Sequence, residues 1–330
     1  ITPSFDSNMM FGFFRSGSIA VTLVLSILYL VVYFFCLFAG QGDIDVINTN
    51  RLISINLPWL VQVVTTPFLV FFSLLFFTFS VNKHRLLDTS GNLPLLFSLL
   101  ILTTGSFSLS INKFSILLLV LTFAIYGMLS LSNQSKKHSP IFNISIVIGI
   151  GSLFYFPIII LILWVYHVLL VLRNFKLREW IMPFIGVGLP YVYFYIFWCL
   201  KNGAFPAINY TQMFGFNEVS LAALPWFKLA FTGVLIVIVV LALPSYFKSI
   251  QSNKIMARKS LSLITWLIVY AVLGVAFFRA SLDFFLLLTL FPVSLLLSSY
   301  FEKIKLQKLA LLISLSLIIA YLIQLTAGLF

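Results

Sequence analysis

Two aspartates, Asp43 and Asp45, directly follow the first long apolar segment of the chain. An acid beside the end of a membrane helix could deprotonate an acceptor hydroxyl, or hold a divalent cation next to a lipid phosphate. The sequence therefore offers this pair as candidate catalytic residues. The plainer alternative is that both are solvated loop aspartates at the membrane edge.

Four further charged residues could bind the phosphate of a substrate or orient its polar groups. Arg279 and Asp283 are four residues apart at a predicted turn, and a guanidinium can bind phosphate with two parallel hydrogen bonds. Arg51 and Lys201 are similar phosphate candidates, and Glu218 lies in the longest predicted loop. The alternatives are a salt bridge that fixes the hairpin for the first pair and membrane anchoring for the other cations.

His167 is the only one of the three histidines that falls inside an apolar segment. An ionisable group within a membrane segment is a functional candidate, although a neutral imidazole bonded to a neighbouring helix is the commoner case. The histidines are scattered and have no metal-ligand spacing, so no metal site is predicted. Cys36 and Cys199 suggest no disulfide framework.

The composition determines the class of protein. Of 330 residues, 62% are hydrophobic and only 8% are charged, whereas soluble domains have about 25% charged residues. The apolar runs are continuous rather than alternating, which favours helices over a β-barrel. We therefore expect an all-α, polytopic membrane protein with a single integral membrane domain over 1–330 and no separate soluble domain. The segment after Arg15 is interpreted as a retained first helix.

About eleven membrane helices are expected, each close to the ~20 residues that a bilayer needs. The segment before Pro157 is short and contains glycines, so it is expected to be broken or only partly inserted. The helices are expected at about 18–38, 58–81, 93–110, 114–131, 141–156, 157–172, 180–200, 225–246, 261–278, 284–300 and 309–330.

The distribution of cations predicts the orientation. The net charge of +12 is spread over alternate loops, which indicates topology rather than nucleic-acid binding. With the N-terminus inside, fifteen of the twenty Lys and Arg residues lie inside and five lie outside, which predicts an N-in, C-out protein. The outer five are Arg51, Lys113, Lys201, Lys228 and Arg279. Glu179 and Glu302 are expected among the inner cations, in solvated pairs.

Two stretches resemble a family of Bacteroidota inner-membrane proteins. They are GSLFYFPIIILILWVYHVLLVLRNFKLREWIMPFIGVGLPYVYFY (Gly151–Tyr195) and SLDFFLLLTLFPVSLLLSSYFEKIK (Ser281–Lys305), and the short FFRSGS (Phe13–Ser18) also fits. The resemblance implies a multi-pass protein of the bacterial inner (cytoplasmic) membrane. It carries no activity with it.

The layout is more loosely similar to GT-C membrane glycosyltransferases. In this comparison Asp43 or Asp45 matches the catalytic acid of the first outer loop, Pro157 the broken helix pair, and Asp283 to Pro292 the late outer segment. The likeness implies a substrate that carries a sugar on a polyprenyl phosphate at the periplasmic face. The first outer loop is short for that class and has no acidic doublet.

Three functions remain open on the sequence. The first is a GT-C-like enzyme or pseudoenzyme of envelope biogenesis. The second is a non-catalytic subunit that binds other inner-membrane proteins in a secretion, motility or envelope-biogenesis complex. The third is a lipid or small-molecule transporter. The sequence has no Walker loop, dinucleotide fingerprint or H-E-x-x-H motif.

Overall fold

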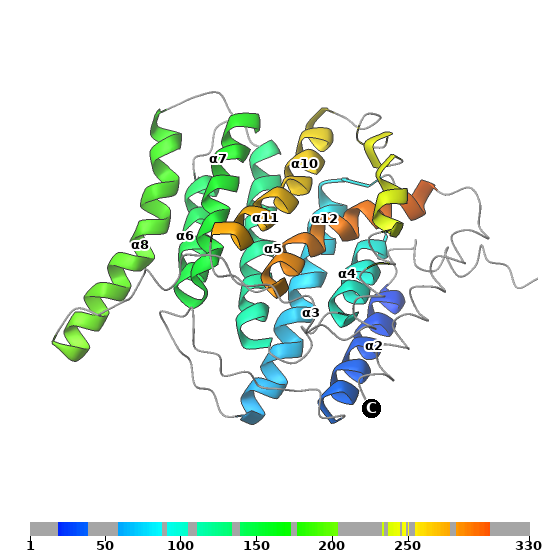
Figure 1. The fold of residues 1–330 in the computed structure, drawn as a ribbon, viewed down its shortest axis with the longest axis horizontal. Coiled ribbons are helices and arrows are strands. Elements are labelled where there is room, and N and C mark those ends of the chain that lie inside the picture. The colour runs from blue at the N-terminus through cyan, green and yellow to red at the C-terminus, as the bar shows by residue number, and fades with distance from the viewer. Residues whose placement is uncertain are drawn as a thin grey trace, which may run out of the picture.

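The structure is a computed structural model that describes residues 19–38, 59–87, 91–104, 111–133, 139–172, 177–203, 233, 237–244, 246–248, 250, 255–277 and 282–303. Within these ranges the chain is helical and forms no strand (Figure 1). The helices are α2 (Ile19–Phe38), α3 (Trp59–Lys83), α4 (Leu93–Thr104), α5 (Ile111–Asn133), α6 (Ser139–Phe154), η2 (Phe156–Ile160), α7 (Leu161–Leu172), α8 (Leu177–Asn202), α10 (Ile255–Thr265), α11 (Leu267–Phe277) and α12 (Leu282–Lys303). The prediction of an all-helical chain is confirmed for this part of the protein.

Three helical segments are long and apolar enough to cross a membrane: Val64–Lys83, Leu177–Asn202 and Ile255–Gly274. Shorter apolar helices fill most of the rest of the described chain. The helix expected at 225–246 is described only in part, and the one expected at 309–330 lies outside the described residues. The count of about eleven spans and the N-in, C-out orientation stay predictions.

The break at Pro157 lies where the sequence places it. Tyr155 is extended, with φ −145° and ψ 103°, and a 3₁₀ turn over Phe156–Ile160 leads into α7. Proline has no N–H to donate to the preceding helix and is tolerated in the first turn of a new one, so α6 ends here and the 3₁₀ turn begins. In contrast, α6 is one continuous helix of 16 residues, so it is not broken, and partial insertion stays a prediction.

The segment expected as one helix over 261–278 begins earlier and is divided. Arg258 and Lys259, expected in a loop, lie in the first half of α10. A turn at Trp266 separates α10 from α11, while Trp266 N–H still donates to the Ser262 carbonyl at 3.0 Å. The two helices therefore form one nearly continuous segment with a local change of winding.

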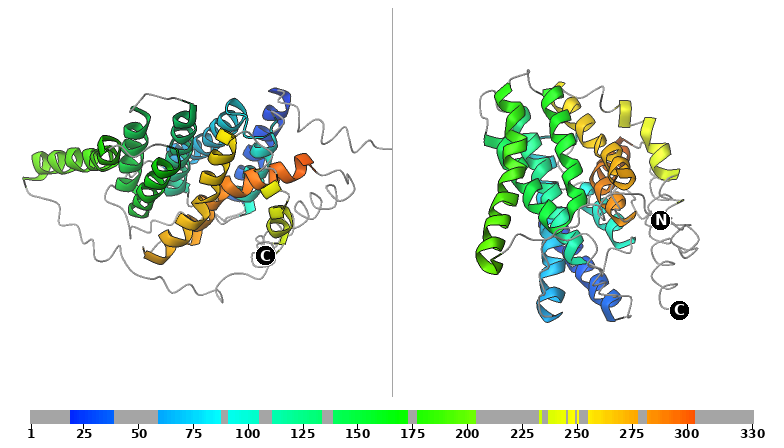
Figure 2. Two further views of the ribbon diagram at one scale, coloured as in Figure 1. Left: turned by 90° about the horizontal axis from the view of Figure 1, so that it is seen from above. Right: turned by 60° about the vertical axis from the view of Figure 1, so that its left-hand side comes forward.

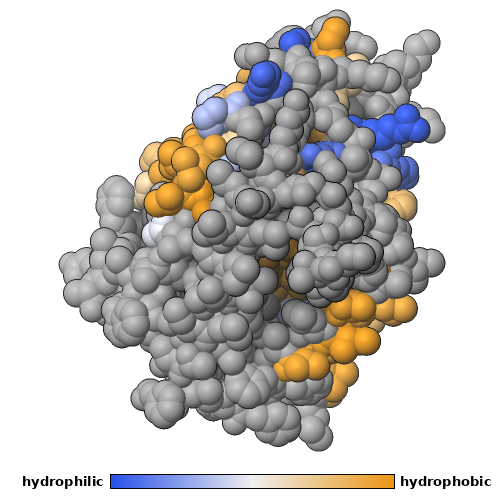
Figure 3. All heavy atoms as spheres, turned by 90° about the vertical axis from the view of Figure 1, so that its right-hand side faces the viewer, coloured by the Kyte–Doolittle hydropathy of each residue, from blue (hydrophilic) through white to orange (hydrophobic). Residues whose placement is uncertain are grey.

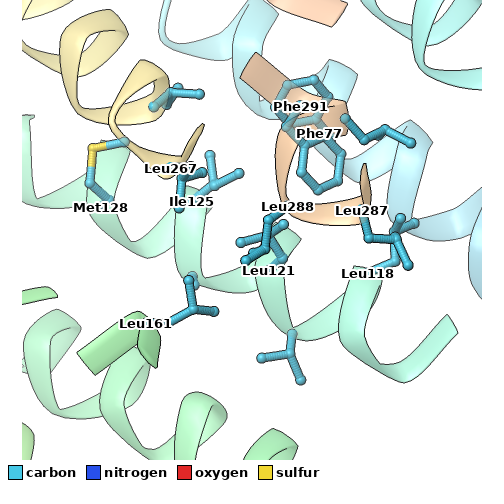
Figure 4. Packing of buried hydrophobic residues seen from close by; sticks show 14 of the residues in the cluster. Phe77, Leu118, Leu121, Ile125, Met128, Leu161, Leu267, Leu287, Leu288 and Phe291 are labelled. Atoms are coloured by element: carbon cyan, nitrogen blue, oxygen red, sulfur yellow. The ribbon is translucent and has the colours of Figure 1, made fainter. Parts of the chain in front are cut away.

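Aliphatic and aromatic side chains from all the described α-helices, α2 to α12, form the core of the bundle. Phe77 of α3 and Phe291 of α12 are fully buried, and their ring centroids are 4.2 Å apart (Figure 4). Leu121 and Ile125 of α5 and Leu161 of α7 extend this cluster. Helix α5 lies at the centre of the packing and contacts α3, α6, α7, α10 and α12.

Helix α8 packs tightly against α6 and lies at the edge of the bundle (Figures 1 and 2). A Cβ atom added at Gly186 would lie 2.5 Å from Ser145 Cβ, and one at Gly149 would lie 2.9 Å from the Val187 carbonyl oxygen. Small residues let membrane helices approach this closely. By contrast, a Cβ at Gly188 would meet nothing within 4 Å.

Candidate functional site

Most of the predicted outer site lies outside the described residues. This applies to Asp43, Asp45, Arg51, Glu218 and Arg279. The backbone of Asp283 lies in the first turn of α12, but its side chain is outside the described part. The proximity of these residues to one another stays a prediction.

Lys201, the described member of that set, lies at the C-terminal end of α8 and is exposed. A cation is favourable there because the last helical carbonyls carry partial negative charge. Its neighbours Phe197 and Leu200 are exposed by 65% and 83%, and Trp198 contacts Phe194 at 5.8 Å between ring centroids. The end of α8 therefore combines one cation with a large exposed apolar surface.

His167 lies on the partly exposed side of α7 rather than in the interior of the described bundle. It shares this side with Leu163 and Leu170, which are exposed. The imidazole meets the ring of Trp266 edge-on at 4.8 Å and that of Tyr270 at 6.1 Å between centroids. Within the described part of the chain it has ring contacts and no hydrogen bond. Trp266 and Tyr270 were not singled out in the sequence, because only the fold brings them to His167.

Helices α3, α5 and α7 end and α8 and α10 begin at one end of the bundle (Figure 1), and the basic residues Lys83, Arg178 and Lys259 lie in these parts of the helices. The Lys83 ammonium donates to the Tyr126 hydroxyl at 3.1 Å and lies over the Tyr126 ring at 5.2 Å from its centroid. The Lys259 ammonium donates to the Val171 carbonyl at 3.3 Å, and so satisfies an oxygen at the end of α7. Figure 3 shows hydrophilic residues mainly at the upper end of one face and hydrophobic residues mainly below them.

The end of α3 is stabilised by a tight capping motif at the basic residues Lys83, His84 and Arg85. Leu86 N–H donates to the Val81 carbonyl and Arg85 N–H to the Asn82 carbonyl, both at 3.1 Å. Arg85 has φ 49°, a conformation that glycine usually supplies at this position. Beside it, burial and then the charge of Lys83 lower the pKa of His84. The capping hydrogen bonds therefore fix the backbone conformation of Lys83, His84 and Arg85.

Two acidic residues expected in solvated pairs are buried instead. Glu179, in the first turn of α8, is 3% exposed, and Glu302, near the end of α12, is 7% exposed. Both take part in interactions within the structure. Both lie close to helix ends among cations in the sequence, and helix packing rather than local sequence covers them.

Ten buried serine and threonine hydroxyls are satisfied within their own helices. Each donates to a carbonyl three or four residues earlier, which is a local pattern. A polar pathway would need such groups to face one another across helices. The described core has two such contacts, from Tyr191 to Ser152 at 2.9 Å and between Tyr246 and Thr265 at 3.0 Å, and the transporter hypothesis stays open. The ten locally bonded hydroxyls are on Ser73, Thr78, Ser80, Ser98, Thr122, Ser145, Ser152, Ser294, Ser298 and Ser299.

Among the described residues there is no group of three or more His, Cys, Asp or Glu side chains that could hold a metal ion. A divalent cation at Asp43 and Asp45 falls outside this part of the chain and stays a prediction.

The helices, their apolar surfaces and the cations at their ends define a helical membrane protein. Comparison with known proteins adds no narrower class, because no family model, no curated protein and no solved structure matches this chain.

Proposed function

We propose that the chain is a multi-pass protein of the bacterial inner membrane with about eleven spans, its N-terminus inside and its C-terminus outside. Two features support this orientation. Lys83, Arg178 and Lys259 lie at one end of the bundle, which becomes the cytoplasmic end. Lys201 lies at the opposite end of α8, which becomes the periplasmic end.

We further propose that this protein of envelope biogenesis handles a sugar carried on a polyprenyl phosphate at the periplasmic end, as a GT-C-like enzyme or pseudoenzyme. The observation that carries the proposal is the end of α8, where exposed Lys201 adjoins exposed Phe197 and Leu200. A polyprenyl phosphate has the matching chemistry, a phosphate at one end of an apolar chain.

The roles of the other residues follow from their chemistry. Asp43 or Asp45 acts as the general base or holds a divalent cation. Arg279 and Arg51 bind phosphate beside Lys201. Glu218 and Asp283 lie in the same outer segments and orient the polar part of the substrate. These two roles rest on the predicted positions of Glu218 and Asp283.

Replacement of Lys201 by Gln tests the lipid site. We expect polyprenyl phosphate bound to the purified full-length protein to fall at least about tenfold, because a hydrogen bond to a charged group is lost. Lys248→Gln is the matched control, since Lys248 is also an exposed lysine on a helix and is predicted to lie on the inner side. Equal retention by both variants, measured by mass spectrometry of the extracted lipid, contradicts a role for Lys201.

The catalytic part of the proposal has a separate test. The double variant Asp43→Asn and Asp45→Asn should abolish glycan transfer in membrane vesicles while the amount of bound polyprenyl phosphate is retained. Unchanged transfer removes both aspartates from catalysis.

A second candidate function is a non-catalytic subunit of a larger inner-membrane complex. The observation in its favour is the side of α8 that faces away from the bundle, where Phe184 and Val192 are exposed and Gly188 has open space around it. A glycine without a packing contact in its own chain is suited to the close approach of another helix. Purification from native membranes in mild detergent distinguishes the two functions: stoichiometric protein partners support the subunit, and a retained glycolipid without them supports the enzyme.

A further inference from the structure

The contact between α7 and the α10–α11 segment, called the seam below, has a side buried in the bundle and a polar side at the protein surface. On the buried side, the Trp164 indole donates to the Leu263 carbonyl at 2.9 Å and joins the two elements. On the surface side, His167 lies against Trp266 and Tyr270. Trp266 is 43% exposed, so its ring forms part of the surface.

Along the seam, two cations lie closer to the cation-bearing end of the bundle than His167 and Trp266. Lys259 contacts the Val171 carbonyl at the end of α7, and Arg258 beside it is exposed. His167 precedes Val171 by four residues, which places it about 6 Å deeper along the helix axis. Below Trp266 the surface is apolar, with Val269 and Val272 exposed.

The order of chemistry along this seam is cations, then imidazole and indole, then aliphatic side chains. A membrane phospholipid presents the complementary order: a phosphate, then ester carbonyls a few ångströms deeper, then acyl chains. The interfacial layer on each side of a bilayer is about 5–8 Å thick, so a donor about 6 Å below the cations lies at the depth of the esters. Each polar element of the seam therefore has a partner in one lipid molecule.

We propose that the seam between α7 and α10–α11 binds one anionic phospholipid of the leaflet at the cation-bearing end. Its phosphate lies at Arg258 and Lys259, and an ester carbonyl accepts a hydrogen bond from His167 or Trp266. Its acyl chains follow Val269 and Val272. This site lies on the opposite side of the membrane from the polyprenyl phosphate site, and neither depends on the other.

Local packing accounts for only part of this arrangement. Lys259 satisfies the end of α7, and His167 packs on Trp266. Neither contact uses Arg258, and neither explains why a histidine occupies the exposed side of α7 below two cations. Basic pockets between membrane helices are the established form of anionic lipid sites.

The first test counts phospholipids retained by the full-length protein in native mass spectrometry, after delipidation and titration with phosphatidylglycerol. We expect one tightly held molecule, about fivefold weaker binding for Arg258→Gln, and about 30-fold weaker binding when Lys259→Gln is added, because each interfacial cation contributes about 1 kcal/mol. Arg85→Gln is the matched control, since it removes a basic residue at the end of α3 and should leave the binding unchanged. Equal binding by Arg258→Gln and wild type overturns the proposal even if Lys259→Gln unfolds the end of α7.

The second test isolates the ester contact. His167→Phe keeps a ring against Trp266 but removes both imidazole nitrogens. Wild type should bind the ester-linked lipid about two- to tenfold more tightly than its ether-linked analogue, which has no carbonyls, because one hydrogen bond is lost. His167→Phe should lose this preference. A preference that persists in the variant, or displacement of the lipid by millimolar inorganic phosphate alone, overturns the assigned pose.

Discussion

The contact between α6 and α8 predicts a large difference between two glycines that are only two residues apart. In Gly186→Ala the new Cβ lies 2.5 Å from Ser145 Cβ and 3.1 Å from the Phe142 carbonyl oxygen. Carbon atoms pack at about 3.5–4.0 Å, so α8 must move by about 1 Å along much of its contact. In Gly188→Ala the new methyl group meets no atom within 4 Å.

The two substitutions share the same gain in helix propensity, about 1 kcal/mol. The difference between them therefore isolates the packing cost, which is about 1–3 kcal/mol for an overpacked contact. We expect Gly186→Ala to lower the free energy of unfolding and Gly188→Ala to leave it unchanged or raise it. The assay is reversible unfolding in mixed micelles of dodecylmaltoside and sodium dodecyl sulfate, followed by tryptophan fluorescence. Equal unfolding free energies for the two variants would refute the close approach of α6 and α8.

Two further predictions concern side chains that join or end the helices. Trp164→Phe removes the bond to the Leu263 carbonyl and leaves a small cavity, so it should lower the free energy of unfolding by about 1–3 kcal/mol in the same assay; no change means that α7 and α10 are joined by other contacts. Burial and then Lys83 lower the pKa of His84 below 6.5, so the folded protein binds a proton less readily than the unfolded chain. Stability should therefore be level above pH 6.5 and fall as the pH drops below it, and His84→Gln should flatten this profile; an equally steep profile in the variant assigns the effect to other groups.

The sequence was sufficient for features that local physical chemistry determines. The break at Pro157 is one, because proline cannot donate to the preceding helix and suits the first turn of a new one, although Pro67 and Pro292 lie inside helices. The existence of the apolar helices is another, since a bilayer needs long uninterrupted hydrophobic runs.

Features that depend on contacts between helices could not be predicted. The burial of Glu179, in the first turn of α8, depends on how α8 packs in the bundle. Arg258 and Lys259 were placed in a loop because charged residues end a hydrophobic run, whereas α10 begins at Ile255 and continues through them. The turn at Trp266 has no proline or glycine beside it to indicate it. Of the candidate site, His167 and Lys201 can be placed, and the contacts of Trp266 with His167 required the fold.

The local bonding of the buried hydroxyls has a consequence for how the protein is made. A serine or threonine that bonds its own helix, such as Ser145 or Ser298, presents no unsatisfied donor to lipid. These helices can therefore leave the insertion machinery one at a time and wait in the bilayer before they meet their neighbours. The bonds that do cross between helices come from larger side chains, such as Trp164 and Tyr191, which bonds Ser152 at 2.9 Å. Helices can then associate after they have inserted into the membrane. Close packing at glycine contacts and a few hydrogen bonds from aromatic side chains would select the correct neighbours.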